Sequence, residues 1–199
     1  MRMIPEQEEP SRVYSTMIRS ITPRPIAWVS TVSPRGITNL APFSYFNGVC
    51  SRPATLSISV VNKPDGSEKD TLRNIRANGQ FVVNLVPFAL GAAMEKSSAD
   101  ADYETSEFEL AGVQPVPSER VRPPGVQASP IRFECQTSQI VPVGEGAFGT
   151  HLVLGRILVI HIDDKVLDDQ GKVAPDRLDT IGRMGPRTYC RTTERFELP

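Results

Sequence analysis

Apolar and polar residues alternate with the two-residue period of a β-strand in several segments of this chain. The clearest is Thr55–Val61, where Leu56, Ile58 and Val60 share one face and threonine and serine residues share the other. The turn-forming run Pro34-Arg35-Gly36 separates two more such segments. In all, the pattern predicts further strands over residues 26–32, 37–41, 80–86, 131–141 and 151–163.

Two of these strands are predicted to differ in how many of their faces are buried. In residues 131–141, apolar residues such as Phe133 alternate with polar ones such as Glu134, so we expect one face of this strand to lie in water. Residues 151–163 are apolar on both faces. We expect that strand to be buried on both faces, between its own barrel and a partner subunit.

Three short segments are predicted as helices. Residues 13–21 carry apolar side chains at helical spacing up to Pro23, and residues 89–99 form a second candidate. The run Lys69-Asp70-Thr71 predicts a helix start with Asp70 or Thr71 as the N-cap. Asn78-Gly79 predicts the end of that helix.

The remaining segments suggest one compact unit. Residues 100–129 are rich in proline, and we expect them to wrap the surface as irregular chain, which in a loop of this length is often functional. We predict an N-terminal arm over residues 1–12 and a single domain over residues 13–199. Strands and helices do not alternate as βαβ units, which predicts a mainly β fold with accessory helices, a mostly antiparallel barrel.

Charge and cysteine usage narrow the classes of partner and compartment. The net charge is −1 and no basic run occurs, so neither nucleic acid nor a membrane surface is expected as a partner. No apolar segment approaches the ~20 residues that span a bilayer, and the first residues do not resemble a signal peptide. Cys50, Cys135 and Cys190 are odd in number and widely spaced, which disfavours disulfides or a zinc site and favours a cytoplasmic protein.

One glycine-rich motif is misleading. Gly144–Gly149 matches the G-x-G-x-x-G fingerprint of dinucleotide-binding folds. That fingerprint requires a helix after the glycines, whose N-terminus meets the pyrophosphate. Here a predicted strand follows, so we interpret these residues as a hairpin connection.

The helix start at Lys69-Asp70-Thr71 has the parts of a phosphate site. A helix N-terminus offers unpaired N–H groups and a partial positive charge. The lysine adds a full charge and the threonine adds a hydroxyl donor. The same residues also fit an ordinary N-cap beside a solvated lysine.

A second candidate feature is the segment Asn39–Asn47 together with the polar face of the 55–61 strand. The segment combines prolines and hydrogen-bonding side chains with three aromatic residues. A flat heteroaromatic ring needs apolar contact on its faces and polar groups at its edge. Together these segments predict a flavin pocket, while the serines alone also fit an exposed strand face.

Other reactive side chains are less informative. His151 and His161 are ten residues apart on one predicted strand, about 33 Å, so they cannot share a metal ion within one subunit, and structural or surface roles are favoured. No metal ligands are assigned. Cys50 lies near the predicted pocket without residues that would activate its thiol. Arg183 and Tyr189 fit either a segment that closes over a ligand or a helix-to-strand turn.

Five segments carry a family resemblance. They are RPIAWVSTVSPRGITNLAPFSYFNGVCSRPATLSISV at 24–60, KDTLRNIRANGQFVVN at 69–84, EFELAG at 107–112, HLVLGRILVIHIDD at 151–164 and IGRMGPRTY at 181–189. In this order they resemble the flavin reductase-like, FMN-binding split-barrel family. That family includes flavoredoxin-type proteins and the small reductase components of two-component monooxygenases.

The resemblance implies a six-stranded antiparallel, Greek-key-like split β-barrel with flanking helices. It also implies a homodimer that binds FMN at the subunit interface. The residues that would line the flavin ring and ribityl chain are Thr31, Ala41, Pro42, Ser44, Phe46 and Asn47. Those near the ribityl chain or phosphate are Ser57, Ser59, Lys69, Asp70 and Thr71, and those that would close the site are Arg183 and Tyr189.

The function implied by the resemblance is hydride transfer from NADH or NADPH to FMN. Flavin itself performs that chemistry, so no side chain is assigned a catalytic role. A monooxygenase or another electron acceptor is implied as a protein partner. The alternatives are an FMN-binding electron carrier or flavin store without NAD(P)H turnover, and a barrel that binds no flavin.

Overall fold

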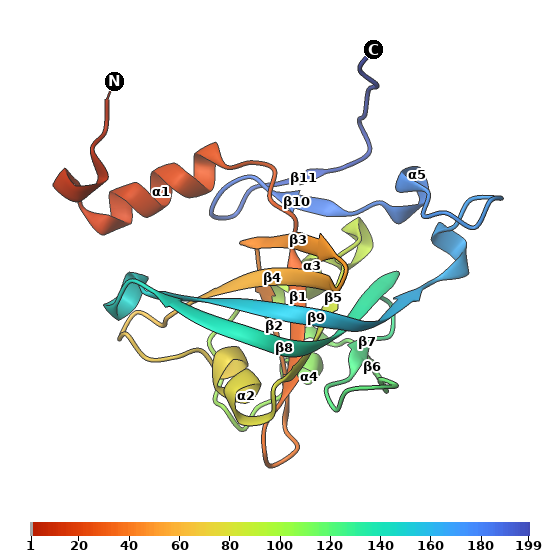
Figure 1. Ribbon diagram of the computed structural model, residues 1–199, viewed down its shortest axis with the longest axis horizontal. Coiled ribbons are helices and arrows are strands. Elements are labelled where there is room, and N and C mark those ends of the chain that lie inside the picture. The colour runs from red at the N-terminus through yellow and green to blue at the C-terminus, as the bar shows by residue number, and fades with distance from the viewer. Residues whose placement is uncertain (1) are drawn as a thin grey trace.

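The structure is a computed structural model that describes residues 2–199. Its main feature is a seven-stranded antiparallel sheet with the strand order β2-β1-β5-β8-β9-β4-β3 (Figure 1). The strands are β1 (Ala27–Val32), β2 (Thr38–Phe43), β3 (Phe46–Ser51), β4 (Ala54–Val61), β5 (Gln80–Asn84), β8 (Ile131–Val143) and β9 (Thr150–Ile162). Two small sheets pair β6 (Pro115–Val116) with β7 (Gly125–Val126), and β10 (Ile181–Arg183) with β11 (Tyr189–Arg191).

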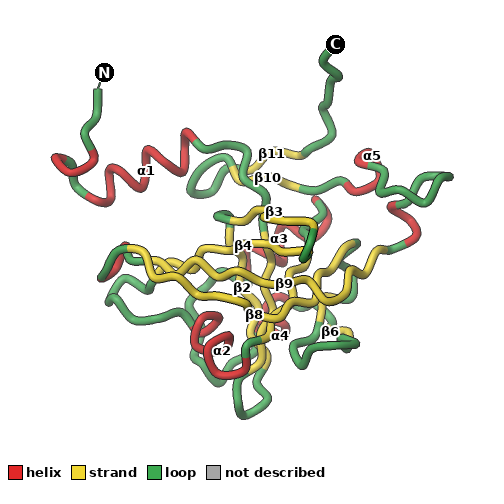
Figure 2. The backbone as a smooth tube through the Cα atoms, viewed as in Figure 1, coloured by secondary structure: helices red, strands yellow, loops and turns green. Residues whose placement is uncertain are grey.

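Short helices surround the sheet (Figure 2). The helix α1 (Pro10–Ser20) and the β10–β11 hairpin lie on the side where both chain ends are drawn, and α2 (Asp70–Asn78) lies on the opposite side. The others are α3 (Gly91–Lys96), α4 (Glu107–Ala111) and α5 (Pro175–Leu178). Across residues 2–199, no helix has the length and apolar character needed to cross a membrane.

The sheet curls because its two edge strands follow each other in the chain. Only Ser44 and Tyr45 connect the end of β2 to the start of β3, at the opposite edge of the sheet. Three Cα–Cα steps span at most ~11 Å, so the two edges must approach each other at this end. The curled sheet is therefore a barrel that is not closed between β2 and β3.

The predicted count of six strands is wrong because β3 was not expected. Its residues do not alternate in polarity, and all but Phe46 are exposed at the sheet edge. The other six strands were predicted within a few residues of their observed bounds. Because β4 lies beside β9 while β5, β8 and β9 are consecutive neighbours, the strand order is that of a Greek key.

Hydrophobic side chains form two cores. The first lies within the curl, where the predicted apolar face of β4 is confirmed by the burial of residues such as Ile58, and where α2 contributes Leu72. The second lies on the outer side of β1, where Trp28 packs with Met94 of α3 and Phe108 of α4. The two cores hold α2 and α3 on either side of β1 and β2.

The N-cap of α2 differs from the prediction. The cap residue is Lys69, not Asp70 or Thr71, and no side chain caps the helix. The Thr71 hydroxyl donates instead to Asn39 Oδ1, at 2.9 Å. The predicted end is confirmed, because Gly79 adopts a left-handed conformation with φ of 70°.

Residues 100–129 are less irregular than expected. They contain α4 and the two short strands β6 and β7. The helix predicted over residues 89–99 is confirmed as α3, preceded by one 3₁₀ turn at Phe88–Leu90. Residues 2–12, expected as an arm, include a 3₁₀ turn at Pro5–Gln7 and the first residues of α1, and Met1 lies outside the described residues.

One expectation about a strand face is wrong, and another depends on a partner subunit. Glu134 was expected in water but is 0% exposed, because residues 119–120 cover it and hydrogen-bond to it. In the single chain, Ile160 and Ile162 of β9 are 48% and 40% exposed, so the expected burial of this strand against a partner subunit stays a prediction. The hairpin predicted at Gly144–Gly149 is confirmed, since it connects β8 to β9.

Candidate functional site

Two cavities adjoin where β2 meets the start of α2. Each has a volume of about 410 Å³, and both are lined by Pro42, Phe43 and Lys69. The α2 cavity extends from residues 63–71 to residues 97–101, and the α1 cavity extends under α1 toward the β10–β11 hairpin. Ligand sites in proteins commonly have volumes of roughly 300–1,000 Å³, and together the two cavities fit within this range.

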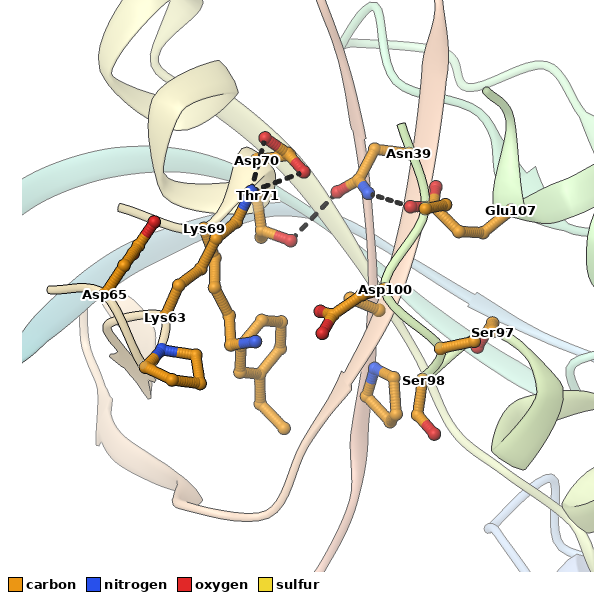
Figure 3. Close-up of a pocket in the computed structure, with 16 residues that line it drawn as sticks. Asn39, Lys63, Asp65, Lys69, Asp70, Thr71, Ser97, Ser98, Asp100 and Glu107 are labelled. Atoms are coloured by element: carbon orange, nitrogen blue, oxygen red, sulfur yellow. Dashed lines mark hydrogen bonds and ion pairs between the residues drawn. The ribbon is translucent and has the colours of Figure 1, made fainter. Parts of the chain in front are cut away.

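The N-terminus of α2 opens into the α2 cavity. No side chain caps this helix, so its first N–H groups have no side-chain acceptor. Asp70 pairs with Lys63 at 3.3 Å, while the Lys69 side chain extends into the cavity, away from that pair (Figure 3). A free ammonium group thus lies beside the partial positive charge of a helix N-terminus.

A buried hydrogen-bond network supports the wall of the α2 cavity. Asn39 Oδ1 accepts a hydrogen bond from Thr71 at 2.9 Å, and the Asn39 amide donates to Glu107 Oε1 at 2.9 Å (Figure 3). The same Oδ1 atom also accepts from Thr31 at 3.1 Å. The second oxygen of Glu107 accepts from the backbone N–H of Leu40 at 3.0 Å. These bonds tie α2, β1, β2 and α4 together and fix the position of Thr71.

Glu107 is the most strongly buried carboxylate in the α2 cavity. Burial raises its pKa, and the hydrogen bonds from Leu40 and Asn39 only partly oppose this effect. Asp65, at the opposite side, is exposed and accepts hydrogen bonds from the Ser67 side chain and backbone, which lower its pKa. Carboxylates therefore line this cavity along its length, and Lys63 and Lys69 supply its positive charge near the start of α2.

The α1 cavity has the opposite charge character. Its described lining includes Arg24, Lys69 and Arg183 and no carboxylate. Arg24 is 4% exposed, and its guanidinium donates to the Ile21 carbonyl at 2.6 Å and to Ser44 Oγ at 3.3 Å. The cavity is therefore positively charged, and Arg24 fixes the end of α1 against it.

An unsatisfied hydroxyl lies beside this positive charge. Tyr45 Oη is buried and has no hydrogen-bond partner within the described part of the chain, and burial raises the pKa of the phenol. Buried polar groups are rarely left unpaired, since each costs about 1–3 kcal/mol. An orphaned donor in the lining of a cationic cavity fits a ligand that carries acceptor oxygens or nitrogens.

The structure brings many of the predicted site residues to the two cavities. Those in the α2 cavity are Ala41, Pro42, Lys69, Asp70 and Thr71. Those in the α1 cavity are Pro42, Ser44, Ser59, Lys69 and Arg183.

Five predicted residues lie outside both cavities. Thr31 is fully buried behind Asn39, and Phe46 packs against the inner core. Asn47 and Ser57 are register partners on β3 and β4, away from the cavity lining. Tyr189 lines a separate cavity.

The segment around Arg183 and Tyr189 is a β-hairpin, so the helix-to-strand interpretation is wrong. The Arg183 guanidinium donates to the Gly185 carbonyl at 3.0 Å and lies 5.2 Å from the centre of the Tyr189 ring. The Tyr189 hydroxyl donates to Glu95 at 2.5 Å. The hairpin therefore presents Arg183 to the α1 cavity and Tyr189 to the far side.

Sequence reasoning assigned no individual role to several residues of the α1 cavity, among them Tyr14, Arg24 and Tyr45, although Tyr45 belongs to the aromatic segment Asn39–Asn47 that predicted a flavin pocket. These three come from α1, the segment before β1 and the link between β2 and β3, so no local pattern connects them. The run Pro23-Arg24-Pro25 was a usable signal for Arg24, because an arginine between two prolines has a restricted backbone.

Both histidines lie outside the two cavities. His161 Nε2 is 2.6 Å from Glu134 Oε1, and His151 Nε2 is 3.9 Å from Glu68 Oε1. In residues 2–199, no three His, Cys, Asp or Glu side chains are arranged to hold a metal ion. The histidines thus belong to polar contacts of the β8–β9 region.

Comparison with known proteins identifies a family. The family model described as the flavin reductase like domain matches residues 18–182. An uncharacterized protein of Aquifex aeolicus is 35% identical over 191 residues, covering 96% of this chain and 95% of that protein.

Solved structures resemble the whole chain. Nitrilotriacetate monooxygenase component B from Bacillus cereus has a TM-score of 0.94 and 34% identity, covering 100% of this chain and 98% of that one. A putative flavin reductase with a split barrel domain from Shewanella frigidimarina has a TM-score of 0.83 and 23% identity, covering 100% and 98% of the two chains. The predicted split-barrel architecture is confirmed by this likeness, with seven strands in place of six.

Proposed function

This chain belongs to the flavin reductase like domain family, and from that premise we propose that it binds FMN and transfers a hydride to it from NADH or NADPH. The FMN site is the crevice formed by the α2 and α1 cavities. The observation that carries this proposal is the uncapped N-terminus of α2, which opens beside the free Lys69 ammonium into a crevice of ligand size.

Charge distribution supports one orientation of the ligand. A phosphate group is favoured near Lys69 and the first N–H groups of α2, because the Lys69 ammonium is unpaired among the described residues, whereas Asp70, the carboxylate at this helix start, is paired with Lys63 (Figure 3). The ring is then favoured along Pro42, Phe43 and Ser44 in the α1 cavity. The orphaned Tyr45 hydroxyl supports the fit, since the polar edge of a flavin ring offers acceptor atoms.

The residues of the chain would bind and orient the flavin and exclude water from it. When bound, FMN supplies the hydride-accepting chemistry itself. Arg24 and Arg183 put positive charge in the α1 cavity, which favours the more negative, reduced form of a bound ring. Side chains of α1, among them Ile18, cover one side of that cavity and shield it from solvent.

A steady-state assay tests this function. Purified protein with excess FMN is expected to oxidise NADH or NADPH faster than the enzyme-free mixture, as measured by loss of nicotinamide absorbance. Oxidation at only the enzyme-free rate with both nucleotides would reject the proposal. The family likeness to a monooxygenase component supports a further expectation, that reduced flavin passes to an electron-accepting protein.

Lys69→Ala tests the phosphate site. We expect the dissociation constant of FMN to rise roughly ten- to a hundredfold, because one charge-assisted hydrogen bond contributes about 1.5–3 kcal/mol. Thr71 is kept intact because its hydroxyl is bound to Asn39. The matched control is Lys165→Ala, which removes an exposed lysine outside the cavities. Equal FMN affinity in the wild type and Lys69→Ala would contradict the proposed role of Lys69 in phosphate binding.

One observation favours a second candidate function, that of an FMN-binding electron carrier or flavin store. The helix α1 covers the α1 cavity and is held there by Arg24, so a ring bound beneath it is shielded from a second nucleotide. This alternative predicts FMN that remains bound through gel filtration, with negligible turnover of NADH and NADPH. Rapid turnover with freely exchanging FMN would reject it.

A further inference from the structure

A third cavity, of about 590 Å³, adjoins the proposed FMN crevice. It shares Ser98 and Ala99 with the α2 cavity. Its other walls come from the end of α3, which contributes Glu95 and Lys96, and from the β10–β11 hairpin, which contributes Arg187 and Tyr189. The third cavity therefore lies directly beside the proposed FMN crevice.

Two charged side chains of this third cavity have no hydrogen-bond or ion-pair partner in the part of the chain that the structure describes. Lys96 and Arg187 are exposed, and neither side chain has a hydrogen-bond or ion-pair partner within residues 2–199. The one carboxylate, Glu95, accepts the Tyr189 hydroxyl proton in a 2.5 Å hydrogen bond. Two free cations therefore face the cavity, whereas the acidic group beside them is already paired.

Tyr189 is held as a fixed wall. Its hydroxyl is bound to Glu95, and the Arg183 guanidinium lies 5.2 Å from its ring centre. Burial and the bond to Glu95 raise the pKa of Tyr189 to about 12, so the phenol stays neutral at physiological pH. A neutral, fixed aromatic ring in the same cavity as two cations suits a ligand that combines phosphate with a planar base.

We propose that the third cavity binds a phosphate group of the nicotinamide dinucleotide, with Lys96 and Arg187 as its anion-binding residues. This inference rests on the proposed function, because it assigns a place to the hydride donor. The nicotinamide must meet the flavin ring in the crevice, so the phosphates of the nucleotide must lie next to the crevice. The third cavity has this position, because it shares Ser98 and Ala99 with the α2 cavity and its Arg187 directly follows Pro186 of the α1 cavity. Both the pyrophosphate and the 2′-phosphate of NADPH have the required chemistry.

The double variant Lys96→Ala/Arg187→Ala tests the proposal. We expect the KM for the nucleotide to rise at least about tenfold, while the dissociation constant of FMN stays at the wild-type value. A rise for NADPH alone identifies the 2′-phosphate as the bound group, and a rise for both nucleotides identifies the pyrophosphate. Lys96→Arg/Arg187→Lys, which keeps both charges, is expected to recover most of the affinity.

The control removes the same charges elsewhere. Arg122→Ala/Lys165→Ala substitutes one exposed arginine and one exposed lysine outside the three cavities, and its KM is expected to match the wild type. An unchanged KM in Lys96→Ala/Arg187→Ala, with an active wild type, would overturn the inference and leave the proposed function standing. A wild type inactive with both nucleotides would overturn the proposed function and this inference with it.

Discussion

At the scale of single residues, Glu134 ties a distant segment to the sheet. Its carboxylate accepts the backbone N–H groups of Glu119 at 2.8 Å and Arg120 at 2.7 Å, and His161 Nε2 lies 2.6 Å away. Burial opposes ionisation, but these three hydrogen bonds outweigh burial and hold the pKa of Glu134 below its usual value. The charged form is thus the one that fastens residues 119–120 to β8.

We expect the protein to lose stability in mild acid in part through Glu134. Because its pKa is lower in the folded state, the unfolded chain takes up the proton first as the pH falls. The stabilisation is complete above the usual carboxyl pKa and disappears as the pH falls through the depressed one. Urea unfolding at several pH values, comparing the wild type with Glu134→Gln, measures this effect.

The variant should be less stable at neutral pH by about 1–3 kcal/mol, the usual cost of leaving a buried group poorly paired. Its free energy of unfolding should also depend less on pH than that of the wild type as the pH falls below the usual carboxyl pKa. Identical pH dependence in the two proteins would contradict the assigned role of Glu134.

At the scale of secondary-structure elements, α2 carries both the inner core and the proposed phosphate site. Leu72 and Ile75 fasten one face of the helix to the sheet, and Thr71 is bound to Asn39. The helix ends at Gly79, whose φ of 70° suits glycine. The position of Lys69 at the cavity therefore depends on how well this helix is anchored.

Gly79→Ala should destabilise the protein by about 1–2 kcal/mol or more. A left-handed conformation costs a residue with a Cβ about that amount, and the new Cβ would lie 2.8 Å from Gln136 Nε2. Thermal unfolding measures the loss. Gly48→Ala is the matched control, since its Cβ would meet no atom within 4 Å and its φ is not positive. Equal melting temperatures for both variants would contradict the role given to Gly79.

Elements that are determined by neighbouring residues in the chain were predicted correctly from the sequence, and features that depend on distant contacts were not. The strand β4 and the end of α2 follow from neighbours in the chain, through alternation at Leu56, Ile58 and Val60 and through the glycine at 79. The strand β3 was missed because its pairing with β4, not its polarity pattern, makes it a strand. The burial of Glu134 was missed because its cover comes from a segment 14 and 15 residues away.

The same difference between local and distant contacts explains which residues of the candidate site were identified from the sequence. Lys69 was identified because a helix start is a local signal. Arg24 was not identified, and Tyr45 was included only as one aromatic residue of the segment Asn39–Asn47, because both reach the α1 cavity only when the sheet curls and brings separate segments together. Tyr189 was grouped with Arg183 by sequence distance, yet in the hairpin the two side chains line different cavities.

At the scale of the whole molecule, the curled sheet leaves an apolar strip on β9 uncovered. Ile160 and Ile162 lie on this strip and are among the most exposed aliphatic residues of the sheet. A second copy of the chain would bury them, in keeping with the homodimer expected from the sequence. The residues that line the proposed FMN crevice are those of a single chain, and the expectation that FMN binds at the subunit interface stays a prediction.

Sedimentation or light scattering tests the dimer. The wild type is expected at twice the 21.9 kDa of one chain, and Ile160→Lys/Ile162→Lys is expected to shift toward the single-chain mass, because a charge in a buried interface costs several kcal/mol. Arg122→Ala, remote from β9 in sequence, serves as a control. A wild type that sediments as a single chain at high concentration would contradict the expectation.

A crystal structure determined after soaking with FMN tests the central claim most directly. We expect flavin density in the crevice between α1 and α2. The phosphate should lie beside Lys69 and the first N–H groups of α2, and the ring should lie along Pro42 and Ser44. Flavin density anywhere else on the molecule, or an empty crevice at saturating FMN, would contradict it.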